Sequence, residues 1–585
     1  MPCHVRLPGA ANPLEVGPGA VLDGDDVDPP EPATIAYEPG SDRVSSVTDP
    51  VTGTVDYTYA PTGERLTMTL PGGGTWTYAY VNDASGFGLT NCVVPKDDPN
   101  SVGAMLTNIT DDQGRRVDYV LDILGTLESI EFNETYNGTN LVSYCLASYY
   151  YDKGDNNRIT SSHLWLTELK NTWNWLSGSW QSSTLSENDY TMDATGQRLT
   201  NKITAADGSS RTEVYGYDEL NRLTSVDYGD GETQGYTFDN MGNRLSKTDN
   251  VTGNESSTFN AANMLLTRGS NNYTNDADGN TLSGGGRTNT WDSQNRMVSC
   301  AYDGNSSQYT YGADGIRRRS VVNGVTTDFA LDSSMFVREL RSGSSIATYL
   351  TGASGPCYRR DDVAGTVRWY LYDGLGSVLD EVDPNGNITA NRRYDVYGSV
   401  RSSTGTSTSK HKFVGALGHP SDDETGLIYM QARYLDPAAG EFLSEDPGRS
   451  GPDPHLYCSD NPVNGLDPDG RVEDYTFWAL ILVVVKGAEA LGLLPNAGVR
   501  AVVEFIASSA EAIAIMKQLW QSVGAINELV KAAMAGESVD PGEALKQGSY
   551  CLLAAEASYV CLVIASEQIV IMLELLTDGS SASND

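Results

Sequence analysis

The stretch YGYDELNRLTSVDYGDGETQGYTFDNMGNRLS, from Tyr215 to Ser246, decides the fold of this chain. It contains two copies of one phrase: an aromatic residue, Asp, two or three residues, Gly or Asn, and then Arg-Leu. Asp218 and Asp239 of the two copies lie 21 residues apart, which is room for about two strands and two turns. A repeat of this length predicts hairpins that stack into a continuous sheet.

The phrase recurs along the chain. Its other copies are MDATGQRLT at 192–200 and the looser YAPTGERLT at 59–67, WDSQNRMVS at 291–299 and YGADGIRRR at 311–319. Alternation of the Tyr215-Gly216-Tyr217 kind puts rings on one face of a strand. Asp followed by Gly or Asn supplies the turn, and the Arg can return toward the Asp and the rings.

Composition excludes several kinds of site. The net charge of −38 would repel nucleic acid, so we expect no nucleic-acid binding by the repeat body. The eight cysteines include no CxxC pair, and there are only five histidines. The sequence therefore predicts no zinc site, no disulfide framework, no metal and no cofactor.

DADGN (276–280) and DPNGN (383–387) begin like calcium loops. An EF-hand needs Glu at loop position twelve, where Arg287 and Tyr394 stand instead. Turns are the better interpretation of both segments.

Residues 1–50 form a Pro- and Gly-rich leader without an apolar core of signal-peptide length. The chain is therefore expected to reach the cell surface or the exterior by a non-classical route, being cytoplasmic before export. Retention inside the cell and a fragment of a longer chain are the alternatives.

The repeated phrases resemble the YD repeats of RHS proteins, teneurins and the BC subunits of insecticidal Tc toxins. WYLYDGLGSVLDEVDPNGNITANRRYDVYGSV (369–400) and GLIYMQARYLDPAAGEF (426–442) resemble the RHS repeat-associated core. The resemblance implies a mainly β fold: YD/RHS repeats over 51–365 and an RHS repeat-associated core over 366–471, wound as a hairpin spiral. A folded tail of 472–585 would need a shell of roughly 6,500 Å². Some four hundred strand residues cover at most ~6,400 Å², so we expect an open or partial shell.

The same resemblance implies a self-cleaving terminus. Matched residue by residue, Arg433 of QARYLD is its functional arginine, and Asp446 and Asp467 are its two aspartates. The expected cut falls between Arg471 and Val472. The family has Leu where Arg471 stands, and the segment between the aspartates is about two residues shorter, so the chain departs from the family at both points.

Two neighbouring carboxylates suit hydrolysis because both cannot easily ionise together. The ionised one can take a proton from water while the protonated one polarises the scissile carbonyl, and a nearby Arg steadies the developing charge. The sequence does not decide whether Asp446 or Asp467 is the base. Both Asp-Pro motifs could also be ordinary turns.

Residues 472–585 predict an all-α segment, with apolar residues at helical spacing and Asp540-Pro541 as a helix start. A helix–helix core is favoured over membrane contact because Glu residues interrupt the apolar stretch from 550 to 576.

The leading hypothesis is a secreted bacterial carrier of the polymorphic-toxin type that releases a helical effector by aspartate-dependent autoproteolysis. An immunity protein and a secretion apparatus are its expected partners. The alternative is a non-enzymatic surface or adhesion protein built on the same repeats.

Overall fold

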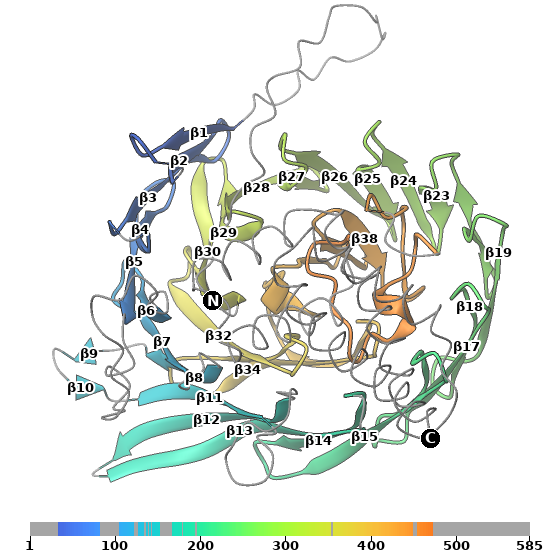
Figure 1. Cartoon of the computed structure of the whole chain (residues 1–585), viewed down its shortest axis with the longest axis horizontal. Helices are drawn as coiled ribbons and strands as arrows, with labels where there is room; N and C mark the ends of the chain where they lie inside the picture. The colour runs from blue at the N-terminus through green and yellow to red at the C-terminus, as the bar shows by residue number, and fades with distance from the viewer. Residues whose placement is uncertain are drawn as a thin grey trace, which may run out of the picture. The chain divides into compact units, whose positions relative to one another are not determined.

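The computed structural model describes residues 33–41, 43–61, 63–81, 105–121, 127–133, 136–137, 140–141, 143–151, 166–177, 179–193, 196–352, 355–448 and 453–471. All of them belong to one compact unit, drawn in colour in Figure 1. The helices expected at 472–585 and the first part of the 1–50 leader lie outside the described residues.

Nineteen of the described strands form the first sheet, and each pairs antiparallel with the next member along the chain. The strands are β1 (Thr34–Tyr37), β2 (Val44–Asp49), β3 (Gly53–Tyr59), β4 (Arg65–Thr69), β5 (Thr75–Val81), β6 (Met105–Thr110), β7 (Arg116–Leu121), β8 (Leu127–Asn133), β11 (Ser143–Tyr151), β12 (Leu166–Ser177), β13 (Ser179–Met192), β14 (Arg198–Ala205), β15 (Ser210–Tyr217), β16 (Leu223–Asp227), β17 (Thr233–Phe238), β18 (Arg244–Asp249), β19 (Glu255–Phe259), β20 (Leu265–Arg268) and β21 (Asn271–Asn272). β9 (Tyr136–Asn137) and β10 (Asn140–Leu141) pair only with each other.

A second sheet of fourteen described strands continues the same meander. The strands are β22 (Thr274–Asn275), β23 (Thr281–Gly284), β24 (Arg287–Trp291), β25 (Met297–Tyr302), β26 (Asn305–Tyr311), β27 (Arg317–Val322), β28 (Val325–Asp332), β29 (Met335–Arg341), β30 (Ser344–Gly352), β31 (Gly355–Asp361), β32 (Thr366–Tyr372), β33 (Val378–Val382), β34 (Ile388–Tyr394) and β35 (Val400–Gly405). The mainly β fold predicted from the repeats is therefore confirmed for the described residues.

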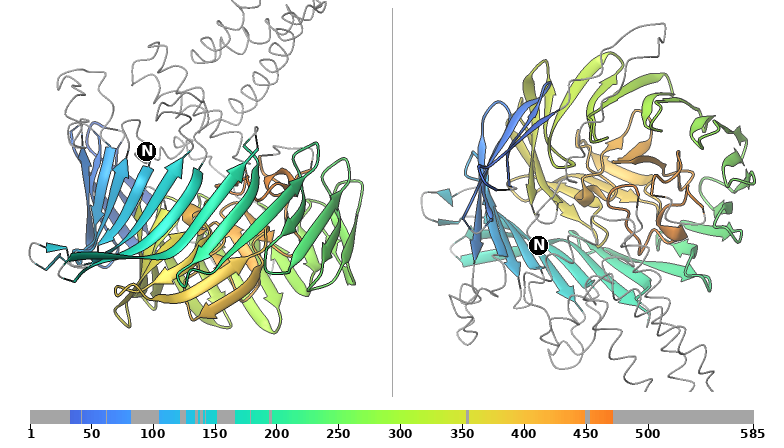
Figure 2. Two further views of the ribbon diagram at one scale, coloured as in Figure 1. Left: turned by 90° about the horizontal axis from the view of Figure 1, so that it is seen from below. Right: turned by 45° about the horizontal axis from the view of Figure 1, so that its top comes forward.

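The two sheets share a hydrophobic core. Met68 and Trp76 of the first sheet belong to the same buried cluster as Val337 and Trp369 of the second. Figure 2 shows the strands of both sheets running side by side along a curved wall. Packing of this kind removes one face of each sheet from water, which an isolated hairpin cannot do.

The repeated Asp closes each turn as the sequence predicts. Oδ1 of Asp218 accepts hydrogen bonds from the backbone N–H groups of Leu220 and Arg222 at 3.0 and 2.9 Å. Nε of Arg222 donates to Oδ2 of the same aspartate at 2.8 Å, and its guanidinium lies 5.0 Å from the ring centre of Phe238. Asp276 of the DADGN segment likewise accepts from the N–H groups of Asp278 and Asn280, so the turn interpretation is confirmed there.

The residue that follows the turn-closing arginine of the repeat points toward the interior. Five residues beyond the Asp, Leu223 and Met297 are completely buried. Arg244 occupies the same position after Asp239, while Asn243 takes over the bond to the Asp at 2.7 Å. The repeat therefore has one arginine position that closes its own turn and another that faces the interior.

Besides the two large sheets and the β9–β10 pair, the unit contains a further part, which lies inside the curve of the large sheets around the label β38 in Figure 1. It is a small sheet with two short 3-10 turns, comprising β36 (Ser421–Asp422), β37 (Leu427–Met430), β38 (Arg433–Asp436), β39 (Glu441–Phe442), η2 (Gly415–Leu417) and η3 (Cys458–Asp460). We call residues 415–448 and 453–471 the inner segment.

Inward-facing arginines of the sheets bind this inner segment. Arg317 pairs with Asp422, and neither side chain is exposed to solvent. Nη1 of Arg287 donates to Asp436 at 2.9 Å, and Nη2 of Arg244 donates to the carbonyl of Ala438 at 2.9 Å. Buried cations without such partners would be costly, so these contacts fix where the inner segment lies.

The strands differ from the predicted domain boundaries in two places. β1 and β2 precede residue 51, so the first sheet begins within the segment assigned to the leader. β31 and β32 pair antiparallel across residue 365, so the second sheet continues through the expected boundary between repeats and core. In the part of the chain that the structure describes, none of the helices has the length and hydropathy of a membrane span.

Candidate active site

Arg433 joins three parts of the inner segment. It begins β38, and its side chain is 3% exposed. Nη2 donates to Oδ2 of Asp467 at 3.0 Å, Nη1 donates to the carbonyl of Pro454 at 3.1 Å, and Nε donates to the carbonyl of Gly470. The guanidinium carbon lies 3.6 Å from the ring centre of Phe442, which covers its remaining face. A planar fork with several donors is needed for this geometry.

Asp467 is completely buried and bonds in two directions. Its Oδ2 accepts from Arg433, and its Oδ1 accepts from the backbone N–H of Arg471 at 3.0 Å. The carboxylate of Asp467 therefore binds both Arg433, the functional arginine that the family resemblance implies, and the main chain at the expected cut. The positive charge of Arg433 compensates an ionised Asp467 in this dry environment.

Asp446 is held by hydrogen bonds to the main chain of Pro454 and Gly448. Its backbone N–H donates to the carbonyl of Pro454 at 2.9 Å, and its Oδ1 accepts from the N–H of Gly448 at 2.7 Å. A β-carbon built on Gly448 would lie 3.2 Å from Oδ1 of Asp446 and 3.3 Å from the carbonyl oxygen of Arg471. The carboxyl group and that carbonyl oxygen therefore border one small space, which Gly448 leaves unfilled.

The turn before the expected cut is held from below. Nε2 of His419 and Nε2 of Gln431 both donate to the carbonyl of Pro468, at 3.0 and 3.2 Å. Burial lowers the pKa of His419 to about 4, so the imidazole is neutral near pH 7. Gly470 has a φ of +73°, and a β-carbon there would lie 2.1 Å from the carbonyl oxygen of Met430. Only glycine fits this close approach.

The structure thus brings together Arg433, Asp446 and Asp467 around the Gly470–Arg471 main chain. Val472, the other residue of the expected cut, lies outside the described residues. Sequence reasoning did not identify His419, Gln431 or Pro454 as parts of this site. No periodic pattern connects them to the aspartates, because each contributes through a turn.

A second acidic cluster lies on the far side of β39. Burial raises the pKa of Glu441 to about 8, the positive charge of Arg244 opposes the rise, and the negative charge of Asp453 adds to it. Burial also raises the pKa of Asp460 well above its ordinary value. Burial therefore disfavours the ionised form of both acids.

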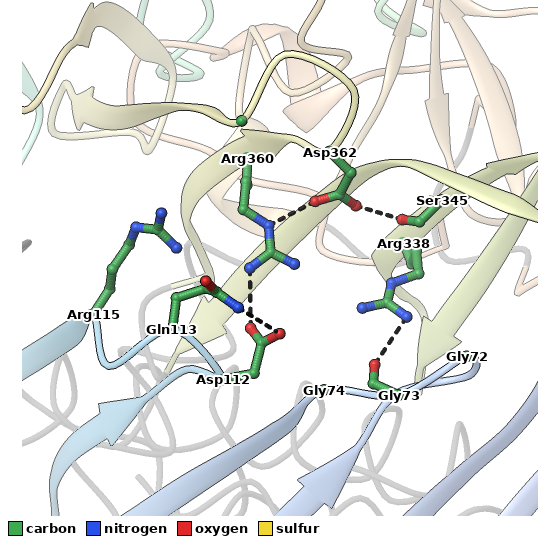
Figure 3. Close-up of a pocket in the computed structure, with 11 residues that line it drawn as sticks. Gly72, Gly73, Gly74, Asp112, Gln113, Arg115, Arg338, Ser345, Arg360 and Asp362 are labelled. Carbon is green, nitrogen blue, oxygen red and sulfur yellow. Dashed lines mark hydrogen bonds and ion pairs between the residues drawn. The ribbon is translucent and has the colours of Figure 1, made fainter.

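A cavity of about 570 Å³ lies elsewhere in the unit, between the turns of the first sheet and strands β29–β32 of the second (Figure 3). Arg360 bridges Asp112 and Asp362 at 3.0 and 2.6 Å, and Arg338 donates to the carbonyl of Gly73 at 3.1 Å. Its cations are therefore compensated by groups of the wall, and we interpret it as a polar seam between the sheets.

Three carboxylates of β12 and β13 could offer metal ligands: Glu168, Glu187 and Asp189 have oxygen atoms within 4.8 Å of one another. Lys170 lies 2.5 Å from Glu187, and Lys202 lies 3.0 Å from Asp189. Because these lysines already compensate much of the negative charge, we assign no metal there.

Comparison with known proteins identifies the repeats. Residues 180–450 match the family described as the teneurin YD-shell. This part of the chain is therefore built from RHS/YD repeats. Its matched region contains the two phrases that start at Tyr217 and Phe238, as well as Arg433 and Asp446.

Curated relatives include named toxins. The chain is 30% identical over 270 residues to the tRNA3(Ser)-specific nuclease WapA of Bacillus spizizenii, a match covering 44% of this chain and 12% of that protein. It is 34% identical over 117 residues to the toxin subunit YenC1 of Yersinia entomophaga, covering 19% of this chain and 12% of the relative. The YD-repeat chain therefore spans only a small part of the length of these relatives.

The fold is also similar to a solved structure. The Tc holotoxin pore of Photorhabdus luminescens aligns with 75% of this chain at a TM-score of 0.51 and 16% identity, using 24% of its own chain. At this identity the likeness supports the β-shell fold of the YD-repeat protein and nothing more.

Proposed function

We propose that this YD-repeat protein is a toxin-related carrier scaffold whose inner segment hydrolyses the peptide bond between Arg471 and Val472. The products are a β scaffold ending at Arg471 and a C-terminal segment 472–585 that acts as the effector. The proposal rests on the convergence of Arg433, Asp446 and Asp467 on the main chain of Gly470 and Arg471.

The reaction consumes one water. Asp467, compensated by Arg433, is the ionised carboxylate that draws a proton from this water. In this scheme Asp446 is the acid that gives a proton to the carbonyl oxygen of Arg471, and both groups border the space beside Gly448. The water oxygen bonds to the carbonyl carbon, the C–N bond breaks, and the leaving nitrogen of Val472 takes up a proton.

This assignment goes beyond a sequence that left the two aspartates interchangeable. Asp467 bonds to the buried guanidinium of Arg433, which favours its charged form and suits it to act as the base.

Intact mass spectrometry of the freshly purified full-length chain tests the proposal. We expect two fragments, with the C-terminal one beginning at Val472, in the wild type and in the control Asp278→Asn, which changes an exposed turn carboxylate. Asp467→Asn and Asp446→Asn should each stay intact. An intact wild-type chain with a folded β-sheet spectrum would reject self-cleavage and favour the alternative of a non-enzymatic surface or adhesion protein.

Effector activity and partners follow from the carrier proposal. Names such as toxin subunit YenC1 among the relatives support a toxin context. In that context the partners are an immunity protein and a secretion apparatus, and the protein is exported from the cell. Expressing the wild-type chain and Asp467→Asn in parallel and scoring growth tests this: toxicity that requires cleavage should be lost in the variant. Equal growth of both strains would argue against a released toxic effector.

A further inference from the structure

The residue just before the expected cut, Arg471, is bound through its main chain by two carboxylates. Its N–H donates to Oδ1 of Asp467 at 3.0 Å and to Oδ1 of Asp469 at 3.0 Å. Asp467 also compensates the charge of Arg433. Asp469 is the second carboxylate that accepts from the Arg471 N–H.

Asp469 is itself fixed by the inner segment. Its carbonyl oxygen accepts from the N–H of Ala432 at 3.1 Å, one residue before Arg433 begins β38. Gly470, which follows it, packs so closely on β37 and β38 that an added β-carbon would lie 2.1 Å from the carbonyl oxygen of Met430. The carboxylate of Asp469 therefore presents a negative charge at a defined place beside residue 471.

The electrostatic surroundings agree with this pairing. Burial raises the pKa of the Asp469 carboxyl, and the positive charge of Arg471 is the largest influence that opposes the rise. Arg433 opposes it more weakly, and the negative charge of Asp446 adds to it. Replacing Arg471 by a neutral residue would leave Asp469 among two further aspartates with less compensation.

We infer that Asp469 is a positioning and specificity-determining residue that holds the main chain of Arg471 for cleavage and selects a basic side chain at position 471. This inference rests on the proposed function. It predicts that an apolar residue at 471 is tolerated only when the charge of Asp469 is removed as well. The two positions should therefore act as a coupled pair rather than independently.

Cell-free synthesis of the full-length chain, with samples taken over time, measures the cleavage rate. We expect Asp469→Asn and Arg471→Leu each to slow cleavage about tenfold, which corresponds to 1.4 kcal/mol of barrier. Arg471→Lys should stay within about threefold of the wild type because it keeps the charge. The double variant Asp469→Asn/Arg471→Leu should cleave faster than either single variant, and Asp278→Asn should behave as the wild type.

Recovery in the double variant is the deciding result, since general loss of structure would make it worse than the single variants. Equal rates for Asp469→Asn and the wild type, or additive losses in the double variant, would overturn the inference while leaving the proposed cleavage intact. If the wild type does not cleave, the proposed function fails. The pairing of the two residues is then tested by thermal unfolding of the wild type, Asp469→Asn, Arg471→Leu and the double variant, where a coupling indistinguishable from zero overturns it.

Discussion

Nη2 of Arg433 lies 3.0 Å from Oδ2 of Asp467, and the two side chains are 3% and 0% exposed. The same guanidinium also donates to the carbonyls of Pro454 and Gly470. One side chain therefore connects β38 both to the segment at Pro454 and to the turn at Asp467–Gly470. An ion pair in this position orders the main chain at Gly470 and Arg471 in addition to balancing a buried charge.

Arg433→Lys should therefore lose more than a conservative change suggests. A single ammonium cannot reach Asp467, Pro454 and Gly470 together, so we expect cleavage to stop and unfolding to cost about 3 kcal/mol less. Urea unfolding measures the stability, and intact mass measures the cleavage. The matched control is Arg319→Lys, whose half-exposed pair with Asp328 should change stability by under about 1 kcal/mol. Equal effects of the two substitutions would contradict the assigned geometry.

The buried pair of Arg317 and Asp422 anchors the inner segment to β27. Arg317→Met leaves the carboxylate of Asp422 buried beside only Lys410, so we expect a loss of about 3–5 kcal/mol in urea unfolding. Arg222→Met removes the turn-closing arginine of a repeat, whose pair with Asp218 is partly exposed, and should cost about 1 kcal/mol or less. Similar losses in both variants would show that the inward-facing arginine position carries no special weight.

Gly470→Ala is expected to disrupt the site through its backbone. The added carbon would stand 2.1 Å from the carbonyl oxygen of Met430, so the turn before the cut must move. Gly304→Ala is the control, because Gly304 has nearly the same φ of +78° but open space around it. It should cost about 1 kcal/mol for the strained conformation and leave cleavage unchanged. If both variants cleave as the wild type does, position 470 tolerates a side chain and the close packing is not required.

The stability of the unit should depend on pH through Glu441. Its pKa is about 8 in the folded chain and ordinarily 4.5, so the folded state binds more protons between these values. Stability from this group is complete below about pH 4.5 and is lost as the pH rises through 8. Glu441→Gln should flatten that part of the curve of melting temperature against pH. A wild-type curve with the same slope as the variant would contradict the assignment.

The neighbours of Glu441 act in the same experiment. The pKa of His455 is also raised: burial opposes the rise, but the carboxylate of Asp453, 3.8 Å from Nδ1, and the hydrogen bond to the carbonyl of Gly279 outweigh it. Its contribution is likewise lost at higher pH, so some slope remains in Glu441→Gln.

The sequence predicted the repeat more fully than the site. Asp218 and Arg222 lie within one turn, so local spacing was enough to pair them. Arg244 follows the same phrase one position later and instead reaches Ala438, almost two hundred residues away. A shift of one residue moves a side chain to the other face of a strand. The repeated phrase alone does not predict which face of the sheet contacts another part of the chain.

The site residues divide in the same way. Arg433, Asp446 and Asp467 could be named from motifs, because each stands in a short recognisable segment. His419 and Pro454 contribute through one imidazole nitrogen and one main-chain carbonyl. Such contacts depend on turns of the inner segment, whose course is set by distant partners rather than by local pattern.

Those distant partners impose an order of events during synthesis. Asp422, Asp436 and Asn461 meet Arg317, Arg287 and Gln197, which precede them by 105, 149 and 264 residues. The strands, by contrast, pair with their neighbours and can wind as they emerge. The inner segment can therefore fold only after the sheets that supply these contacts are in place. Cleavage after residue 471 by this segment would then occur only in chains whose sheets have already folded around it.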